Sequence, residues 1–338
     1  MTELPRFAIR LHGGMDSRVC AAAARHAERH GFSTVWFAEN PFQRGVLPAA
    51  TAGALATETI EIGIGVFNPF NRHPTLMAME IGALDEISNG RAILGIGAGV
   101  PKMIGKFAPF EKVAAALRDT IAIAGPLLAG EEVVHAGKVF SADHVKLSYE
   151  PHRERIPIFF AAMGERMLRL CGETGDGLLI SNMCPPSFTG RAIGIMTDGA
   201  KAAERPPPAE IVKYVPCVVA ADGAEARKAV KPAIGAMLGA YWEAYQPTPA
   251  ALSAIGGDNG IEPENFAASL QRLAAGDPAE AVLDDSFVSA YAVAGTVEQC
   301  LEQCRDLAAT GVTQMTVTFH GDAPEDSMAR FGDAARGA

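Results

Sequence analysis

Polar and charged residues follow a series of short apolar runs, and their types suit proton handling and anion binding. Those that stand in or just after such runs are Arg10, His12, Glu39, Asn40, Arg44, Asn68, Ser181, Asn182 and His320. Carboxylates and imidazoles move protons, whereas arginine binds anions through charge-assisted hydrogen bonds. Arg10 is the most informative, because it stands inside an apolar run, where a charge needs a partner. That partner is either Glu39, in a structural ion pair, or an anionic group of a ligand.

A glycine loop offers a second kind of ligand contact. Gly97-Ala98-Gly99 ends an apolar run, and a ligand can approach a backbone without side chains closely. The loop lacks the third glycine of a dinucleotide fingerprint, and no acidic residue follows at the expected spacing. The sequence therefore disfavours a Rossmann site for NAD.

The stretch from Ala161 to Arg166 is the best candidate for a phosphate site. Its residues are Ala161, Ala162, Met163, Gly164, Glu165 and Arg166, and they join a short apolar run to a helical pattern. Free N–H groups and the positive dipole end at a helix start attract a phosphate, and Arg166 adds a charge. Small-residue loops are common at strand ends, so an ordinary turn is the alternative. The sequence has no Walker A, Gly-x-Ser-x-Gly or His-Glu-x-x-His motif.

Eight apolar segments alternate with helical patterns and must position these residues. The predicted strands are Phe7–Leu11, Thr34–Ala38, Ile60–Val66, Ala92–Ile96, Ile158–Ala161, Gly177–Ile180, Ile211–Val219 and Gln314–His320. The predicted helices are Ser17–His30 with Ser17 as cap, Pro48–Thr57, Pro74–Ile87, Lys112–Leu128, Glu165–Glu173, Ala224–Leu238, Thr296–Ala309 and a terminal helix in Pro324–Ala338. This α/β alternation favours a closed (β/α)8 TIM barrel over a doubly wound open sheet. In such a barrel the polar residues above meet at the carboxyl ends of the strands.

Two insertions interrupt the alternation within what we expect to be a single domain spanning residues 1–338. The first, residues 131–148, contains Val133–Phe140, which predicts a small hairpin turning at Ala136-Gly137. The second, residues 239–287, is a long helical insertion between strands seven and eight, with a predicted helix over Pro263–Ala275. It is either a lid or subunit contact, or an ordinary peripheral addition.

The bulk properties narrow the range of partners. The chain has 338 residues, of which 49% are hydrophobic, and its net charge of -10 argues against a nucleic-acid partner. No signal-peptide core or run of transmembrane length occurs, so we expect a cytoplasmic protein without membrane contact. The six cysteines lack metal-ligand spacing, which predicts buried free thiols and no metal site. We expect His26 and His30 on a solvated helix face and His73 as a helix cap.

Five motifs carry a resemblance to a known family. They are Asn68-Pro-Phe-Asn-Arg-His-Pro74, Leu84-Asp-Glu-Ile-Ser-Asn-Gly-Arg91, Leu94-Gly-Ile-Gly-Ala-Gly99, Pro157-Ile-Phe-Phe-Ala-Ala-Met-Gly164 and Cys171-Gly-Glu-Thr-Gly-Asp-Gly-Leu-Leu-Ile180. With these motifs the chain resembles the luciferase-like superfamily of flavin- and coenzyme F420-dependent oxidoreductases. Within it, the chain is most similar to F420-dependent methylenetetrahydromethanopterin reductases. The resemblance covers residues 5–185 well and the remainder loosely.

The resemblance implies where a cofactor lies and what holds it. A non-proline cis peptide that supports the cofactor ring maps onto Gly65-Val66, and the Gly97-Ala98-Gly99 loop maps beside the ring. The cofactor phosphate maps onto Ala161 to Arg166, in agreement with the argument from the helix start. Arg44 matches the reductase pattern. A homodimer is expected on the same ground.

The chain departs from its relatives at three positions. Glu39-Asn40 replaces an Asp-His pair, Val100 replaces an acidic residue after the glycine loop, and Arg10 replaces a glutamate in the first strand. An acid near the ring would protonate the substrate during hydride transfer. We therefore expect Glu39, beside Asn40, to handle the proton. The predicted substrate contacts are Arg10, His12, Arg44, Ser181, Asn182 and His320, and Asn68 joins the predicted cofactor contacts.

The combined prediction is hydride transfer between coenzyme F420 and a small organic substrate. Two alternatives stay open. One is an FMN-dependent monooxygenase, or an NADH-using methylene-tetrahydropterin reductase, on the same barrel. The other is a flavin-binding relative without catalytic activity, which the missing acids suggest.

Overall fold

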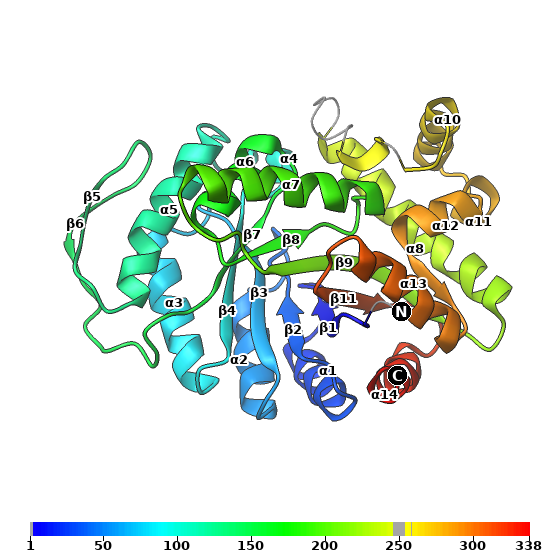
Figure 1. Cartoon of the computed structure of the whole chain (residues 1–338), viewed down its shortest axis with the longest axis horizontal. Coiled ribbons are helices and arrows are strands. Elements are labelled where there is room, and N and C mark those ends of the chain that lie inside the picture. Colours follow the sequence, from blue (N-terminus) through cyan, green and yellow to red (C-terminus); the bar gives the residue numbers. More distant parts are fainter. Residues whose placement is uncertain (1–2, 246–253, 258) are drawn as a thin grey trace.

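A closed barrel of parallel strands forms the centre of the computed structural model, which describes residues 3–245, 254–257 and 259–338 (Figure 1). The strands around the ring are β1 (Arg6–Leu11), β2 (Thr34–Phe37), β3 (Glu61–Phe67), β4 (Ala92–Gly97), β7 (Ile158–Ala161), β8 (Gly177–Ile180), β9 (Glu210–Val219) and β11 (Gln314–Phe319). Pairing of β8 with β9 and of β11 with β1 closes the ring. The closure confirms the TIM barrel and excludes the doubly wound open sheet.

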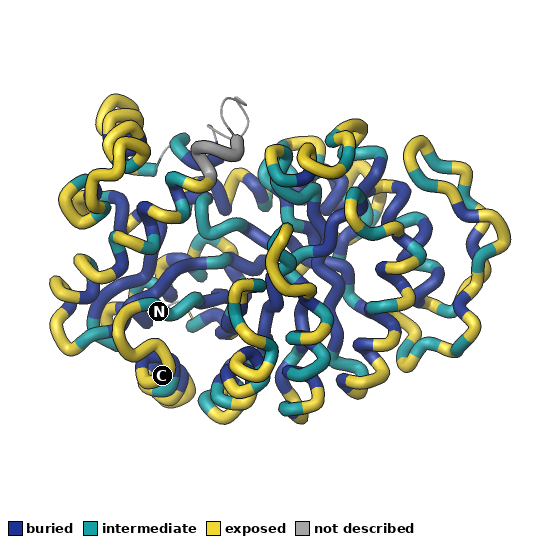
Figure 2. Tube along the Cα trace, turned by 180° about the vertical axis from the view of Figure 1, so that it is seen from behind, coloured by how far each residue is buried: buried dark blue, intermediate teal, exposed yellow. Residues whose placement is uncertain are grey.

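Helices surround this barrel on its outer side (Figure 1). They are α1 (Ser17–Arg29), α2 (Val46–Ala56), α3 (Pro74–Ile87), α4 (Pro101–Ile104), α5 (Val113–Leu128), α6 (Glu165–Thr174), α7 (Pro186–Ala202), α13 (Val297–Ala309) and α14 (Pro324–Arg336). Figure 2 shows the consequence for burial, with the barrel strands mostly buried and the helices exposed on their outer faces. The eight predicted strands agree with the observed bounds to within one residue at each end.

The structure corrects several details of the predicted elements. Asp16, not Ser17, caps α1, because its side chain accepts the Arg18 N–H. Helix α2 begins at Val46, before the predicted start. The sequence pattern missed α7, whose glycines weaken the helical signal, and the strand β10 (Val293–Gly295), which is three residues long and pairs with the end of β9.

Histidines on the two sides of the barrel have different roles. His73 is the N-cap of α3, as predicted, since its ring accepts the Thr75 N–H. His26 and His30 were expected on a solvated face, but they contact α14 instead. His30 Nδ1 lies 2.8 Å from a carboxylate oxygen of Asp333. That helix face is therefore partly covered by the terminal helix.

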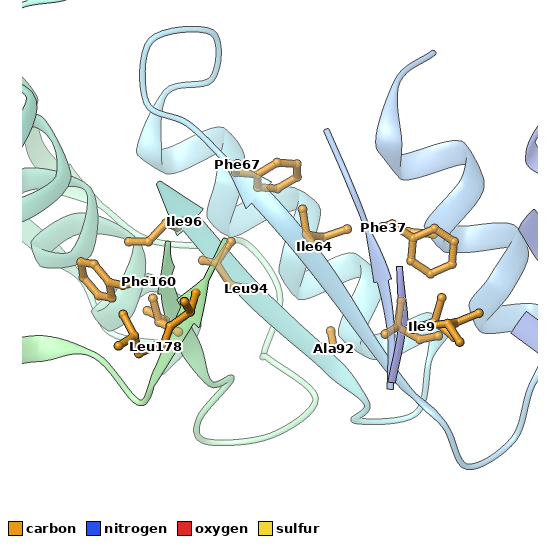
Figure 3. Close-up of a cluster of buried hydrophobic side chains, with 14 of the residues drawn as sticks. Ile9, Phe37, Ile64, Phe67, Ala92, Leu94, Ile96, Phe160 and Leu178 are labelled. Carbon is orange, nitrogen blue, oxygen red and sulfur yellow. The ribbon is translucent and has the colours of Figure 1, made fainter. Parts of the chain in front are cut away.

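Alternation along the strands separates two apolar layers. Ala8, Trp36, Ile93, Phe159, Leu179 and Val212 form a cluster of their own, which fills the barrel interior. The outer layer faces the helices, and Figure 3 shows part of it, including Ile9, Phe37, Ile64, Phe67, Leu94 and Phe160. Because side chains of a strand alternate between the two faces, Arg10 follows Ala8 into the barrel and Tyr214 follows Val212.

The predicted hairpin insertion is present but turns later than expected. Strands β5 (Val133–Ala136) and β6 (Ser141–Val145) pair antiparallel, so Val139 and Phe140 lie in the turn and not in a strand. Asp119 of α5 holds this turn, because its carboxylate accepts the N–H groups of Val139 and Phe140 at 2.7 and 3.1 Å. These bonds lower the pKa of Asp119 despite its burial.

The second insertion is helical, as predicted, and packs around a core of its own. It begins in the last turns of α8 (Gly223–Tyr245), which extends past its predicted end, and continues with α10 (Pro263–Ala274), α11 (Ala279–Val282) and the start of α12 (Asp285–Tyr291). Val230, Ile234, Phe266, Phe287 and Tyr291 are among the side chains of this core. Residues 246–253 and 258 of the predicted insertion lie outside the described residues. Its role as a lid stays a prediction.

All six cysteines are buried and free, as predicted. In the part of the chain that the structure describes, no helix is long and apolar enough to cross a membrane. The described residues also hold no group of three His, Cys, Asp or Glu side chains that would bind a metal ion.

Candidate active site

The carboxyl end of β3 forms the floor of the candidate site. The peptide bond between Gly65 and Val66 is cis, as the resemblance implied, and the pairing with β4 shifts register between Ile64 and Phe67. A Cβ atom at Gly65 would stand 2.5 Å from the hydroxyl oxygen of Tyr214. Glycine is therefore the residue type that lets this part of β3 lie against the barrel interior.

Strand β4 lies equally close to this floor. A Cβ atom at Gly95 would stand 2.1 Å from the carbonyl oxygen of Ile64, and one at Gly97 would stand 2.9 Å from Val66 Cγ2. The Cβ of Ala161 is 3.2 Å from the same point at Gly97, which places the end of β7 beside this pair. The predicted contacts Gly65, Val66, Gly97 and Ala161 thus meet at one place. Glycine at Gly65 and Gly97 is what allows the three strand ends to pack this closely.

The loop after β3 is held by its own hydrogen bonds and by an ion pair. The side-chain oxygen of buried Asn68 accepts the N–H groups of Phe70 and Asn71. Arg72 stacks 4.0 Å from the centre of the Phe67 ring and donates to Glu39 at 2.6 Å. Of the two alternatives for Arg10, the pair with Glu39 is therefore absent, because Arg72 binds the Glu39 carboxylate. Asn68 thus stabilises the loop through hydrogen bonds to the loop's own backbone.

Helix α6 begins beside the floor with an open N-terminus. Its N-cap, Gly164, makes no side-chain cap bond, and a Cβ atom there would meet nothing within 4 Å. Arg166 is exposed in the first turn, and Met163 and Ala162 lead into it. Glu165 points its carboxylate at Arg169, 2.9 Å away on the next turn of the same helix. The backbone at the helix start is thus accessible to an anion.

Asn40 and Arg44 support the loop that follows β1. Asn40 Oδ1 accepts the Gly13 N–H at 3.0 Å, and Arg44 Nη1 donates to the Gly14 carbonyl at 2.8 Å. His12 Nδ1 accepts the Gly14 N–H at 3.2 Å, so the neutral ring carries its proton on Nε2. Asn40 and Arg44 consequently stabilise the conformation of this loop by binding its backbone.

His12 follows β1 and His320 follows β11, so both lie at the carboxyl end of the barrel, which we call its mouth. Burial and the nearby charge of Arg10 lower the pKa of His12. Burial and the neighbouring His12 lower the pKa of His320. Both imidazoles are therefore mainly neutral at pH 7 and act as hydrogen-bonding groups there.

Arg10 lies among unpartnered polar groups inside the barrel. Its guanidinium carbon is 5.7 Å from the centre of the Tyr214 ring. Arg10 Nε, the Tyr214 hydroxyl and the Thr316 hydroxyl are buried and have no hydrogen-bond partner. Burial lowers the pKa of Arg10 and raises that of Tyr214, which keeps the phenol protonated. Tyr214 was not among the predicted site residues, although a tyrosine beside a lysine in an apolar strand was a visible signal.

A buried lysine fixes the loop after β8. Lys213 Nζ donates to the carbonyl oxygens of Ser181 and Cys184 at 2.7 and 2.6 Å. Burial lowers its pKa to about 8. Within the loop, the Ser181 hydroxyl donates to Asn182 and accepts the Met183 N–H. Lys213 thus holds the loop that carries Ser181 and Asn182 through two hydrogen bonds to its backbone.

These features define a class of protein: a (β/α)8 barrel with closely packed glycines and a candidate ligand site at the carboxyl ends of its strands. The chain belongs to the luciferase-like monooxygenase family, whose model matches residues 5–314. This finding confirms the superfamily that the sequence motifs indicated.

The chain is also similar to characterised relatives over most of its length. It is 31% identical over 297 residues to 5,10-methylenetetrahydromethanopterin reductase of Methanolobus tindarius, covering 86% of this chain and 87% of that one. Identity to the Archaeoglobus fulgidus reductase of the same name is 31% over 292 residues, or 86% of each chain. The structure of the coenzyme F420-dependent tetrahydromethanopterin reductase from Methanopyrus kandleri superposes with a TM-score of 0.84 and 24% identity, covering 98% of this chain and 97% of that one.

Proposed function

We propose that the protein transfers a hydride between coenzyme F420 and a small organic substrate. The meeting of three strand ends carries this proposal: Gly65-Val66, Gly97 and Ala161 pack closely together at the carboxyl ends of β3, β4 and β7, and a flat ring would lie on Val66 and the neighbouring backbone. The open start of α6 lies beside the floor and suits the cofactor phosphate. Similarity to reductases, one of them F420-dependent by name, supports the same cofactor.

Each predicted cofactor contact has a part in this proposal. Gly65 and Val66 support the ring, Gly97-Ala98-Gly99 and Asn68 border it, and Ala161 to Arg166 receive the phosphate through backbone N–H groups and the Arg166 charge. F420 supplies a hydride when bound and does not readily activate oxygen, which distinguishes the proposed reaction from that of a monooxygenase. The chain's own residues bind and orient the two reactants and keep water away.

The group that handles the proton is proposed from the observed contacts. Glu39 was expected in this role, but its carboxylate accepts from Arg72 and Asn71. The Tyr214 hydroxyl lies against the Gly65 floor, is buried, and stays protonated because burial raises its pKa. We therefore assign the proton-donating position to Tyr214 Oη and a loop-supporting role to Glu39 and Asn40.

Binding measurements on the purified protein test the proposed cofactor. We expect a colourless protein that binds F420 with a dissociation constant of about micromolar and binds FMN far more weakly. A retained yellow flavin would assign the protein to the FMN-dependent monooxygenases instead. Binding of neither cofactor would contradict both assignments, and binding without turnover of any substrate would favour a non-catalytic relative.

We also propose a homodimer through the face formed by α2, α3 and the hairpin. Large apolar side chains are exposed on this face at Leu55, Met79, Ile87 and Val134. Leu55 is 73% exposed and Val134 is 65% exposed. Tyr149 donates to the Met79 carbonyl, which holds the base of the hairpin against α3. A monomer in sedimentation at micromolar concentration would contradict this. The free buried thiols suit a reducing compartment, and we propose the cytoplasm.

A further inference from the structure

Arg10 differs from Arg91 and Arg153, two other partly buried arginines, because its buried Nε has no acceptor. Arg91 donates to the carbonyls of Ser88, Ile60, Ala54 and Thr57 and to the Thr57 hydroxyl. Arg153 binds the buried carboxylate of Asp85 at 2.8 Å. Arg10 Nε, in contrast, has no acceptor, and no described carboxylate forms an ion pair with this guanidinium. A buried guanidinium nitrogen without an acceptor, on a charge without an anion, is costly, and this points to a ligand.

The proposed phosphate position lies across the barrel from Arg10, so the cofactor phosphate is not that ligand. Arg10 lies on β1, whereas the open helix start follows β7. Around the ring these two strands are four positions apart in both directions, through β2, β3 and β4 or through β11, β9 and β8. Arg10 and the start of α6 therefore stand across the mouth from each other, with the β3 floor between them. The barrel offers two separate anion positions.

The groups around Arg10 favour a single negative charge. The two histidines at the ends of β1 and β11 are mainly neutral at pH 7, because burial lowers the pKa of each. Glu39 is paired with Arg72, and Asp16 caps α1, so neither carboxylate neutralises the guanidinium. One guanidinium among neutral donors matches a carboxylate, which accepts two parallel N–H bonds from an arginine, better than a doubly charged phosphate.

We propose that Arg10 binds a carboxylate group of the organic substrate, with His12, His320 and the Tyr214 hydroxyl completing the pocket. This inference rests on the proposed function, since it assumes that the cofactor ring covers the Gly65-Val66 floor. Bound there, the carboxylate places the rest of the substrate over the floor, between the two anion positions. The substrate class is thus a small carboxylic acid that accepts or gives a hydride.

The test compares carboxylic acids with their amides on the F420-loaded protein. Benzoate and benzamide, and acetate and acetamide, are titrated calorimetrically, and inorganic phosphate is the third probe. We expect each acid to bind about tenfold or more tightly than its amide and than phosphate, because only the acid pairs bidentately with Arg10. R10M should lower the affinity for the acids by about tenfold or more, and R10K should restore part of it. R25M, at an exposed arginine of α1, is the matched control and should change nothing.

The outcomes separate this inference from the proposed function. F420 affinity within about threefold of wild type in R10M, with acid affinity lost, supports the inference. Equal binding of acids and amides, binding of phosphate as tight as that of the acids, or equal losses in R10M and R25M would overturn it. So would a loss of F420 affinity in R10M, which would make Arg10 a cofactor contact. If the wild type does not bind F420 at all, the proposed function fails, and the same titrations on the free protein still test the pocket.

A stability measurement guards against misfolded variants. R10M removes a buried charge that has no partner, so the ligand-free variant should melt at or above the wild-type temperature. The wild type should gain melting temperature with benzoate, and R10M should not. If R10M melts lower, T316V and Y214F, each of which removes one unpartnered hydroxyl, replace it. Undiminished acid binding in both of those variants and in R10M would refute the pocket.

Discussion

The hydroxyl oxygen of Tyr214 lies 2.5 Å from the point where a Cβ atom on Gly65 would stand. The ring carbon that bears this hydroxyl is 3.7 Å from the same point, and Trp36 Cε3 is 3.3 Å away. The contact that excludes a side chain at Gly65 is therefore made mainly by one oxygen atom. Strands β3 and β9, far apart in the sequence, share this contact at the bottom of the site.

Substitution G65A should lower both stability and F420 affinity. The added methyl group collides with the Tyr214 hydroxyl, and overpacking of this kind costs about 1–3 kcal/mol. Denaturant unfolding and F420 titration measure the two effects. Y214F in the G65A background should recover most of the lost stability, because removal of the oxygen leaves contacts of 3.3 Å or more. Additive losses in the double variant would show that the collision is not the cause.

Gly164 provides a test of the phosphate position without loss of stability. G164D places a carboxylate at the N-cap of α6, a position where aspartate stabilises a helix over glycine by a few tenths of a kcal/mol. The same carboxylate repels a phosphate, so F420 affinity should fall by about tenfold or more. G164N caps the helix without the charge and is the control, with a smaller loss. Equal F420 affinity in G164D and wild type would remove the phosphate from this helix.

The Glu39–Arg72 pair tests which residue handles the proton. Both side chains are at most 14% exposed, so E39Q and R72M should each destabilise the protein, and the double variant should lose less than the sum. We expect E39Q to leave the pH dependence of kcat in place. Y214F, which removes the proposed donor, should lower kcat by about tenfold or more at all pH values. A pH limb of kcat that vanishes in E39Q would return the role to Glu39.

Lys213 should give the protein a stability that depends on pH. Its pKa is about 8 in the folded chain against 10.5 in the unfolded chain, because burial disfavours the ammonium. Between these two pH values the unfolded chain binds more protons at this position, so the wild type gains stability relative to K213M as pH rises. The gain should total roughly 1–3 kcal/mol and level off above the upper value. A difference that does not change between pH 7 and pH 10.5 would contradict the assignment.

The fold was largely predictable because each barrel strand is a mainly apolar run, with few charged residues such as Arg10 and Lys213, and most turns have their own signal. Strand ends follow from where such runs stop, which is why the bounds agree so closely. The floor residues Gly65, Val66 and Gly97 were also accessible, because a recurring motif marks them. Helix α7 was missed because three glycines within it dilute the apolar pattern.

Side-chain partners were less predictable, because they depend on which strands become neighbours around the ring. Glu39 forms an ion pair with Arg72 of the next loop and not with Arg10 of the adjacent strand. Stacking on the Phe67 ring holds the Arg72 guanidinium close to the Glu39 carboxylate. Tyr214 and Arg10 are about two hundred positions apart in the chain, and only closure of the barrel through β11 brings them together. Sequence spacing carries no information about such a pair.

The order of strands around the ring also separates two kinds of evolutionary change. The floor and the open helix start belong to β3, β4 and β7, whereas Arg10, His12, Tyr214 and His320 belong to β1, β9 and β11. Tyr214 packs on Gly65 of the floor, whereas Arg10, His12 and His320 belong to β1 and β11, so mutations at these three positions leave the floor intact. Substrate specificity of such a barrel can therefore change during evolution while the residues that bind the cofactor stay the same.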